Sequence, residues 1–297
     1  MKINKILVPV DFSECSNKAV DFALHLGDKF NAHITLLHIV SLFHEDVNEE
    51  SRLHDFERVI QNREQWINGK LKEHENTADQ HRVKVDSVLL RGFTTADKIL
   101  EYIQENNFDL VVIGSHGRTG IKHLLQGSVS EKVVRLSNIP VLTIHHSAKN
   151  YDPKIILVPI DFSKFSKIAM ERAQFFAQLY NAKIIFLHII EQVIHPAFYA
   201  ANIESVFQID PSLKKRTLNK LKEFVDLPEI KSEYLVLEGK AYKEIVETAN
   251  KKKVDLIVMG TQGLTGLDYF LMGSTAERVV RLAECSVLTV ARPANKK

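Results

Sequence analysis

The sequence is poor in cysteine, and the two cysteines that it has, Cys15 and Cys285, lie near opposite ends of the chain. A disulfide framework needs more pairs than this, so we interpret both residues as ordinary thiols in a reducing compartment. The apolar run in "MKINKILVPVDF" has only five residues before Asp11, too few for a signal-peptide core or a membrane-spanning helix. We therefore expect a cytoplasmic protein with no membrane partner.

The sequence also lacks an excess of charge of one sign. Its 39 Lys and Arg residues nearly balance its 37 Asp and Glu residues, which gives a formal net charge of +2. This balance gives no reason to expect a polyanion, so we expect no nucleic acid as a partner. With 297 residues, of which 45% are hydrophobic, the chain is long enough for two globular domains, each with its own core.

The chain carries an internal duplication. The segment "ILVPVDFS" at 6–13 returns as "ILVPIDFS" at 156–163, and "DLVVIGSHG" at 109–117 returns as "DLIVMGTQG" at 255–263. An offset of 146 to 150 residues between the copies indicates a duplicated domain, because the repeats of a solenoid are much shorter.

The boundary between the copies falls in "HHSAKNYDP" at 145–153, a polar stretch that ends in proline and is not a flexible Gly/Ser linker. We therefore predict one domain at 1–147 and a second at 152–293. The copies resemble each other least in their middle parts, at 41–80 and 191–227.

Within each copy, short runs rich in Val, Ile and Leu alternate with longer amphipathic segments, which indicates repeated βα units around a parallel sheet covered on both faces. In the first copy we expect strands at 4–10, 33–40, 83–90, 109–114 and 140–145. We expect helices from a cap at Ser13 or Ser16 to about residue 30, over roughly 51–76, over "TADKILEYIQENN", and from Gly127 and Ser128 onward. The predicted fold class is α/β: two tandem Rossmann-like domains, each a five-stranded parallel sheet flanked by helices, with a ligand crevice where the winding reverses.

One glycine pattern occurs in both copies. The segments "GSHGRTGIKHLLQGS" at 114–128 and "GTQGLTGLDYFLMGS" at 260–274 share the spacing G-x2-G-x9-G-[ST]. Glycine after a strand lets the backbone turn tightly and lets a ligand come close. The helix that begins at the last glycine presents unpaired N–H groups and a partial positive charge to the crevice. The pattern therefore predicts a site for phosphate oxygens.

Polar side chains beside this pattern fit the same ligand. Ser128 and Ser130 can supply hydroxyl donors, and Asp11 at the end of the first strand can accept from a ribose hydroxyl or hold a hydrated Mg²⁺. A nucleotide uses all of these groups at once. The alternative is that glycines after strands and Gly-Ser at helix starts are ordinary punctuation of an α/β domain. Their repetition at the same spacing, each time with an aspartate after the first strand, favours the nucleotide.

With the "VPVDFS" and "VVRLSNIPVLTI" segments around it, this spacing resembles the universal stress protein family, in its tandem form with two such domains in one chain. The resemblance covers nearly the whole sequence. It implies a Rossmann-like domain, similar to adenine nucleotide alpha hydrolases, that binds ATP with Mg²⁺ and regulates or protects during stress without rapid turnover. It also implies a homodimer or an internal pairing of the fifth strands, at 140–145 and 286–291.

The resemblance implies specific contacts in both copies. The adenine and ribose contacts fall on Pro9, Val10, Asp11 and Val40, and on Pro159, Ile160, Asp161 and Ile190. The phosphate contacts fall on Gly114, Gly117, Arg118, Gly127, Ser128 and Ser130, and on Gly260, Gly263, Gly273 and Ser274. In the second copy Leu264 replaces Arg118 and Ala276 replaces Ser130, so we expect weaker binding there.

Other readings of the sequence stay open. His38 and His188 repeat at matched positions inside apolar strands without a second ligand at metal spacing, so we interpret them as hydrogen-bonded core residues and expect no resident metal. Folds of this class also host nucleotidyl transferases and ATP pyrophosphatases, but the sequence has neither their loops nor an evident general base beside the glycines. A slow ATPase, or a dimeric scaffold that works without nucleotide, remains the alternative to an ATP-binding regulator.

Overall fold

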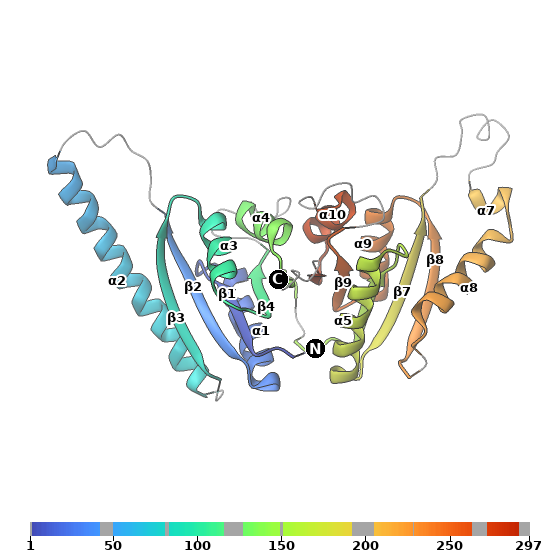
Figure 1. Ribbon diagram of the computed structural model, residues 1–297, viewed down its shortest axis with the longest axis horizontal. Helices are drawn as coiled ribbons and strands as arrows, with labels where there is room; N and C mark the ends of the chain where they lie inside the picture. The colour runs from blue at the N-terminus through green and yellow to red at the C-terminus, as the bar shows by residue number, and fades with distance from the viewer. Residues whose placement is uncertain are drawn as a thin grey trace. The chain divides into compact units, whose positions relative to one another are not determined.

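The computed structural model describes residues 2–41, 50–80, 83–115, 127–148, 151–191, 205–227, 229–262 and 272–290. The chain divides into two compact units, of which one comprises Lys2–His146 and the other begins at Ser147. Each unit is an α/β domain built on the same succession of elements (Figure 1).

The first unit is a five-stranded parallel sheet with the strand order β3-β2-β1-β4-β5. Its elements are β1 (Lys5–Pro9), α1 (Glu14–Phe30), β2 (His33–Ser41), α2 (Glu50–Gln80), β3 (Val85–Gly92), α3 (Thr95–Glu105), β4 (Leu110–Gly114), α4 (Ser128–Leu136) and β5 (Val141–Ile144).

The second unit repeats this sheet in the order β10-β9-β6-β7-β8, again with parallel pairing throughout. Its elements are β6 (Ile155–Pro159), α5 (Lys164–Tyr180), β7 (Lys183–Ile190), α7 (Val206–Ile209), α8 (Leu213–Val225), β8 (Ser232–Glu238), α9 (Ala241–Lys252), β9 (Leu256–Gly260), α10 (Ser274–Leu282) and β10 (Ser286–Val290). The predicted fold class is confirmed in both halves.

The strand order explains where a ligand can bind. The chain moves outward from β1 to β3 and then returns across the sheet to β4, so right-handed crossovers place α1 and α2 on one face and α3 and α4 on the other. The direction of winding reverses between β1 and β4, which are neighbours. The carboxyl ends of these two strands therefore open a crevice that no crossover covers.

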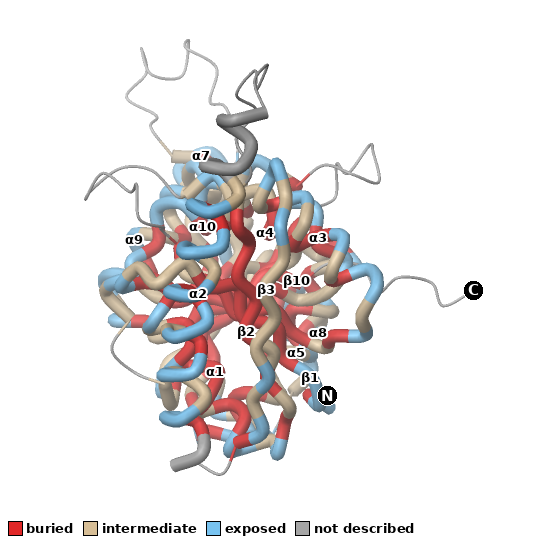
Figure 2. The backbone as a smooth tube through the Cα atoms, turned by 90° about the vertical axis from the view of Figure 1, so that its left-hand side faces the viewer, coloured by how far each residue is buried: buried red, intermediate tan, exposed pale blue. Residues whose placement is uncertain are grey.

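The strands form the core of each unit. Ile6, Leu7 and Val8 of β1 are fully buried, and so are Val111 and Val112 of β4. In Figure 2 the tube through β2 is mostly red, in agreement with the five consecutive buried residues in that strand. Continuous burial on both faces is what an apolar parallel strand between two helical layers requires.

Matching caps fix the first helix of each unit. The Ser13 side chain accepts a hydrogen bond from the Ser16 N–H and caps α1, and Ser163 does the same for α5. Of the two predicted caps, the structure thus selects Ser13. The helix α2 extends four residues beyond its predicted end at residue 76. Among the described residues, no helix is long and apolar enough to cross a membrane.

Candidate functional site

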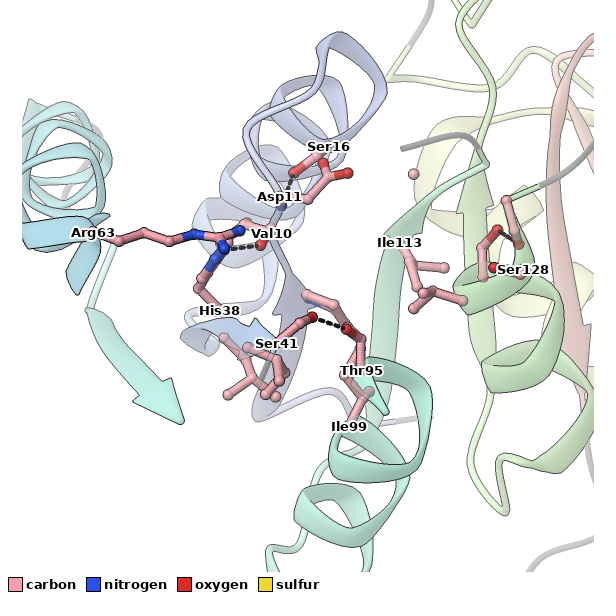
Figure 3. Close-up of a pocket in the computed structure, with 17 residues that line it drawn as sticks. Val10, Asp11, Ser16, His38, Ser41, Arg63, Thr95, Ile99, Ile113 and Ser128 are labelled. Carbon is pink, nitrogen blue, oxygen red and sulfur yellow. Dashed lines mark hydrogen bonds between the residues drawn. The ribbon is translucent and has the colours of Figure 1, made fainter. Parts of the chain in front are cut away.

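Each unit contains a cavity at the carboxyl ends of its central strands. The cavity in the first unit has a volume of about 310 Å³ (Figure 3). Its walls come from the ends of β1, β2 and β4, from α2 and α3, and from the start of α4. The lining residues are Pro9, Val10, Asp11, Ser16, Leu37, His38, Ile39, Ser41, Arg63, Thr95, Ile99, Ile113, Gly114, Gly127, Ser128, Val129 and Ser130.

The second unit has a cavity of about 350 Å³ at the equivalent place. Its walls come from the ends of β6, β7 and β9, from α9, and from the start of α10. The lining residues are Pro159, Ile160, Asp161, Ser166, His188, Ile189, Glu191, Ala241, Ile245, Met259, Gly260, Thr261, Gln262, Gly273, Ser274, Thr275 and Ala276.

Most of the residues that the sequence singled out come together in these cavities. The structure places there Pro9, Val10, Asp11, Gly114, Gly127, Ser128, Ser130, Pro159, Ile160, Asp161, Gly260, Gly273 and Ser274. The positions of Gly117, Arg118, Gly263 and Leu264 lie outside the described residues. Segments as distant in sequence as Pro9 and Gly127 thus meet at one site.

Two predicted residues, Val40 and Ile190, do not line the cavities. The residues of this strand that line the first cavity are Leu37, His38, Ile39 and Ser41. Val40 is fully buried in the sheet. In the second unit His188, Ile189 and Glu191 line the cavity, and Ile190 does not.

The start of α4 forms one end of the first cavity. Gly127 is the N-cap residue, and with no side chain it supplies no acceptor for the N–H groups of the first turn. Its own N–H donates to the Ser115 carbonyl oxygen at 2.9 Å, which ties the helix start to the end of β4. Ser128 and Val129 follow directly and line the cavity. The first-turn amides of such a helix favour an anion.

The start of α10 is built in the same way, and Gly273 shows that packing does not demand glycine there. Its φ of −62° and ψ of 140° suit any residue. Among the described residues, an added Cβ would have one near neighbour, the Thr261 carbonyl oxygen, at an ordinary contact distance of 3.5 Å. Neither the backbone nor the described neighbours of Gly273 require a glycine there, which is consistent with room for a ligand beside the helix start.

The glycines that end β4 and β9 are required by the close packing of neighbouring helices. A Cβ on Gly114 would lie 2.8 Å from the carbonyl carbon of Cys15, and one on Gly260 would lie 2.6 Å from Cβ of Phe165. Both distances are shorter than real contacts, so these glycines allow α1 and α5 to pack on the strands. Packing among the described residues therefore accounts for the first glycine of the pattern, whereas it does not require the last glycine of the second copy.

Ser130 lines the first cavity but uses its hydroxyl within the protein. Its Oγ lies 3.0 Å from the Ser115 carbonyl oxygen and 2.9 Å from that of Gly127, to either of which it donates. The side chain is buried and fastens α4 to the end of β4. Ala276, its counterpart, lacks this bond. The missing hydroxyl therefore removes a support of the helix start in the second unit.

The loop after β1 aims Asp11 at the cavity. Oδ1 of Asp11 accepts from the Ser13 N–H at 3.0 Å, and the Asp11 N–H donates to Oγ of Ser16 at 3.1 Å. The next residue, Phe12, has a φ of 62°, which is uncommon for a bulky side chain. Asp161 and Phe162 repeat this geometry in the second unit, where the φ of Phe162 is 64°.

The paired histidines are hydrogen-bonded as predicted. Nδ1 of His38 lies 2.7 Å from the Val10 carbonyl oxygen, and Nδ1 of His188 lies 2.7 Å from that of Ile160. Burial lowers the pKa of His188, which favours the neutral ring. The sequence did not indicate that both histidines also line the cavities.

Three further residues line the first cavity. Arg63 projects from α2 toward the ends of β1 and β2, across the cavity from Ser128 (Figure 3). Ser41 and Thr95 face each other, with their hydroxyl oxygens 3.2 Å apart. Thr95 belongs to the segment "RGFTTADKIL", which the sequence indicates at most as a helix cap beside the crevice, whereas Arg63 and Ser41 lie in the part of the chain where the two copies differ most, so the repeat could not reveal them.

The comparisons with known proteins agree with this architecture. A family model described as the universal stress protein family matches residues 2–145 and 153–291. A universal stress protein of Methanocaldococcus jannaschii is 38% identical over 144 residues, 47% of this chain and 83% of that protein. The universal stress protein E homolog of Haemophilus influenzae is 24% identical over an alignment that covers 100% of this chain and 99% of its own. A crystal structure of a universal stress protein from Archaeoglobus fulgidus shares the fold, with a TM-score of 0.71 at 21% identity over 98% of this chain and 100% of that chain.

Proposed function

The chain belongs to the universal stress protein family, with one family domain in each half, and we propose that it binds ATP with Mg²⁺ in both halves and acts as a stress-response regulator. The observation that carries this proposal is the start of α10. Gly273 lies there at one end of a cavity of about 350 Å³, and neither its backbone angles nor its neighbours among the described residues require a glycine. Phosphate groups fit such a helix start, and the cavity has room for a nucleoside.

The described lining residues suit a nucleotide at both ends of each cavity. Ser128 and Ser274 lie at the helix starts, where phosphates are favoured. Asp11 and Asp161 lie after β1 and β6, where a carboxylate can accept from a ribose hydroxyl or contact a hydrated Mg²⁺. Mg²⁺ would neutralise part of the charge on the phosphates.

We propose binding without rapid turnover. Among the described lining residues, the carboxylates are Asp11, Asp161 and Glu191, which follow strands β1, β6 and β7 and do not belong to the first turn of α4 or α10. No described lining residue at the helix starts is a general base for an attacking water. We expect steady-state hydrolysis well below the roughly 10 per second of a typical enzyme.

Two measurements on the purified full-length chain test this function. Denaturing release followed by chromatography identifies nucleotide that is carried through purification, and a phosphate-release assay with added MgATP measures turnover. The proposal expects ATP binding with slow turnover. Fast Mg²⁺-dependent hydrolysis would make the protein an ATPase, and failure to bind added ATP would favour the alternative of a scaffold that works without nucleotide.

The assembly is part of the proposal. In each unit the fifth strand, β5 or β10, lies at the end of its own sheet order. We propose that the fifth strands pair at these sheet ends, either within one chain or between two chains in a homodimer. Sedimentation velocity of the full-length chain, with and without ATP, measures this directly.

A further inference from the structure

The two cavities differ at the end of the second strand of each sheet. Ser41 ends β2, and its Oγ lies 3.2 Å from Oγ1 of Thr95, the first residue of α3. At the equivalent place in the second unit, Glu191 follows β7 and its Oε1 accepts from the N–H of Ala241, the first residue of α9, at 2.5 Å. A pair of hydroxyls in one cavity is thus replaced by a carboxylate in the other.

The position of Glu191 relative to α10 decides which part of a ligand it meets. The start of α10, with Gly273 and Ser274, attracts phosphate, so a bound nucleotide has its phosphates there. The remaining walls, at the ends of β7 and α9, carry the apolar Ile189 and Ile245. An aromatic base fits these walls, and Glu191 lies among them. This step rests on the proposed nucleotide-binding function.

A carboxylate discriminates between purines by the group at position 6. An ionised glutamate only accepts hydrogen bonds. The amino group of adenine donates at that position, whereas hypoxanthine presents a carbonyl oxygen that also only accepts. We propose that Glu191 makes the second cavity selective for 6-aminopurine nucleotides over 6-oxopurine nucleotides.

The described lining residues of the first cavity give no such selectivity. The hydroxyls of Ser41 and Thr95 each donate or accept, so they accommodate an amino or an oxo group. Arg63, which lines this cavity as well, adds donors and not acceptors. The two halves of one chain therefore share a phosphate end and differ in how they select the base.

The test compares MgATP with MgITP on the full-length chain in which Gly127→Val blocks the first cavity. Calorimetric titration of this chain is expected to show ITP binding about tenfold more weakly than ATP, because only the 6-amino group can donate a hydrogen bond to the Glu191 carboxylate. Glu191→Gln in the same chain should bring the two nucleotides to within about threefold, since its amide still accepts from Ala241 and can also donate. Glu247→Gln, an exposed residue of α9 outside the cavity, removes the same charge and should leave the tenfold ratio unchanged.

Trp66 fluorescence gives a second measurement that does not need the Gly127→Val variant. It is the only tryptophan of the chain, and its ring contacts Phe12, next to Asp11, with the centroids 5.6 Å apart. In the unaltered chain its fluorescence therefore reports the first cavity alone, and calorimetry reports both. Equal affinity of ATP and ITP at the second site, or a ratio that Glu191→Gln does not change, overturns the selectivity while nucleotide binding stands. Absence of any nucleotide from the second site overturns both.

Discussion

At the scale of single residues, α2 supplies a positive charge to the first cavity through Arg63. Arg63 lines the cavity, and the next residue, Glu64, is bound by Arg91 of β3 with Nε 2.7 Å from the carboxylate. This hydrogen bond lowers the pKa of Glu64, and Arg91 also contacts Glu57 at 3.2 Å. Arg91 thereby holds α2 in the position from which Arg63 reaches the cavity.

We predict that Arg63→Gln weakens ATP binding at the first site by roughly fivefold, which is what one unit charge at about 4 Å supplies through water. The second site should keep its affinity. Trp66 fluorescence during an ATP titration measures the first site. Arg58→Gln is the matched control, because Arg58 is an exposed arginine of the same helix that does not line the cavity. Equal losses in both variants would mean that only the net charge of α2 matters.

Cys285 allows a test of a pH dependence. Burial raises the pKa of its thiol to about 12, so at pH 8 the reactive thiolate is only about one part in ten thousand. In a Cys15→Ala chain, we expect a thiol reagent to modify Cys285 at least about 100-fold more slowly than free cysteine at pH 8, and faster as the pH rises. Unfolding in denaturant should restore the ordinary rate. Rapid modification of the folded chain would contradict the raised pKa of this half-buried thiol.

At the scale of elements, the strands and caps were predictable and the walls of the cavities were not. The apolar runs predicted all five strands of the first unit to within two residues at each end, because buried parallel strands need continuous hydrophobic sequence. Serine followed by a helical pattern predicted the start of α1 in the same way. These signals are local, so the sequence contains them.

The signals that failed depend on three-dimensional context. Nothing in the periodicity of α2 distinguishes Arg63 from the solvated charges around it, because its cavity is formed by strands elsewhere in the sequence. The resemblance pointed to Val40, but its neighbours Ile39 and Ser41 line the cavity and Val40 does not. The resemblance indicated the correct part of β2, and only the three-dimensional structure shows which of its residues line the cavity.

Substitutions of the glycines at the two ends of the motif are expected to change the free energy of unfolding by different amounts. Gly260→Ala should lower the free energy of unfolding by about 1 to 3 kcal/mol, because the new methyl group collides with Phe165. Gly273→Ala should lower it by no more than about 1 kcal/mol, the ordinary cost of alanine in place of glycine at a helix N-cap, because the extended backbone and the described neighbours accept a methyl group. Urea denaturation of both variants measures the difference. A large loss of stability in Gly273→Ala would mean that the fold itself requires this glycine, which would weaken the argument for a ligand at the helix start.

At the scale of the whole molecule, the duplication has produced two cavities that lie at the same place in each fold and differ in their lining residues. Arg63 and the predicted phosphate ligand Arg118 belong to the first half, whereas Leu264 and Glu191 stand in the second. A charge-assisted hydrogen bond to phosphate contributes roughly 1.5 to 3 kcal/mol, so one such bond makes a difference of about tenfold to a hundredfold in affinity. We therefore expect the first half to fill with ATP before the second.

The most direct test of ATP binding in both halves is a calorimetric titration of the nucleotide-free, full-length chain with MgATP, repeated on two variants. We predict two sites per chain, the tighter of which disappears in Gly127→Val and the weaker in Gly273→Val, because each valine places a side chain where the phosphates approach a helix start. If the unaltered chain gives no binding heat and no thermal stabilisation at millimolar ATP, the cavities are not ATP sites. If Gly273→Val removes the tighter site while Gly127→Val leaves it intact, the order of the two halves is wrong.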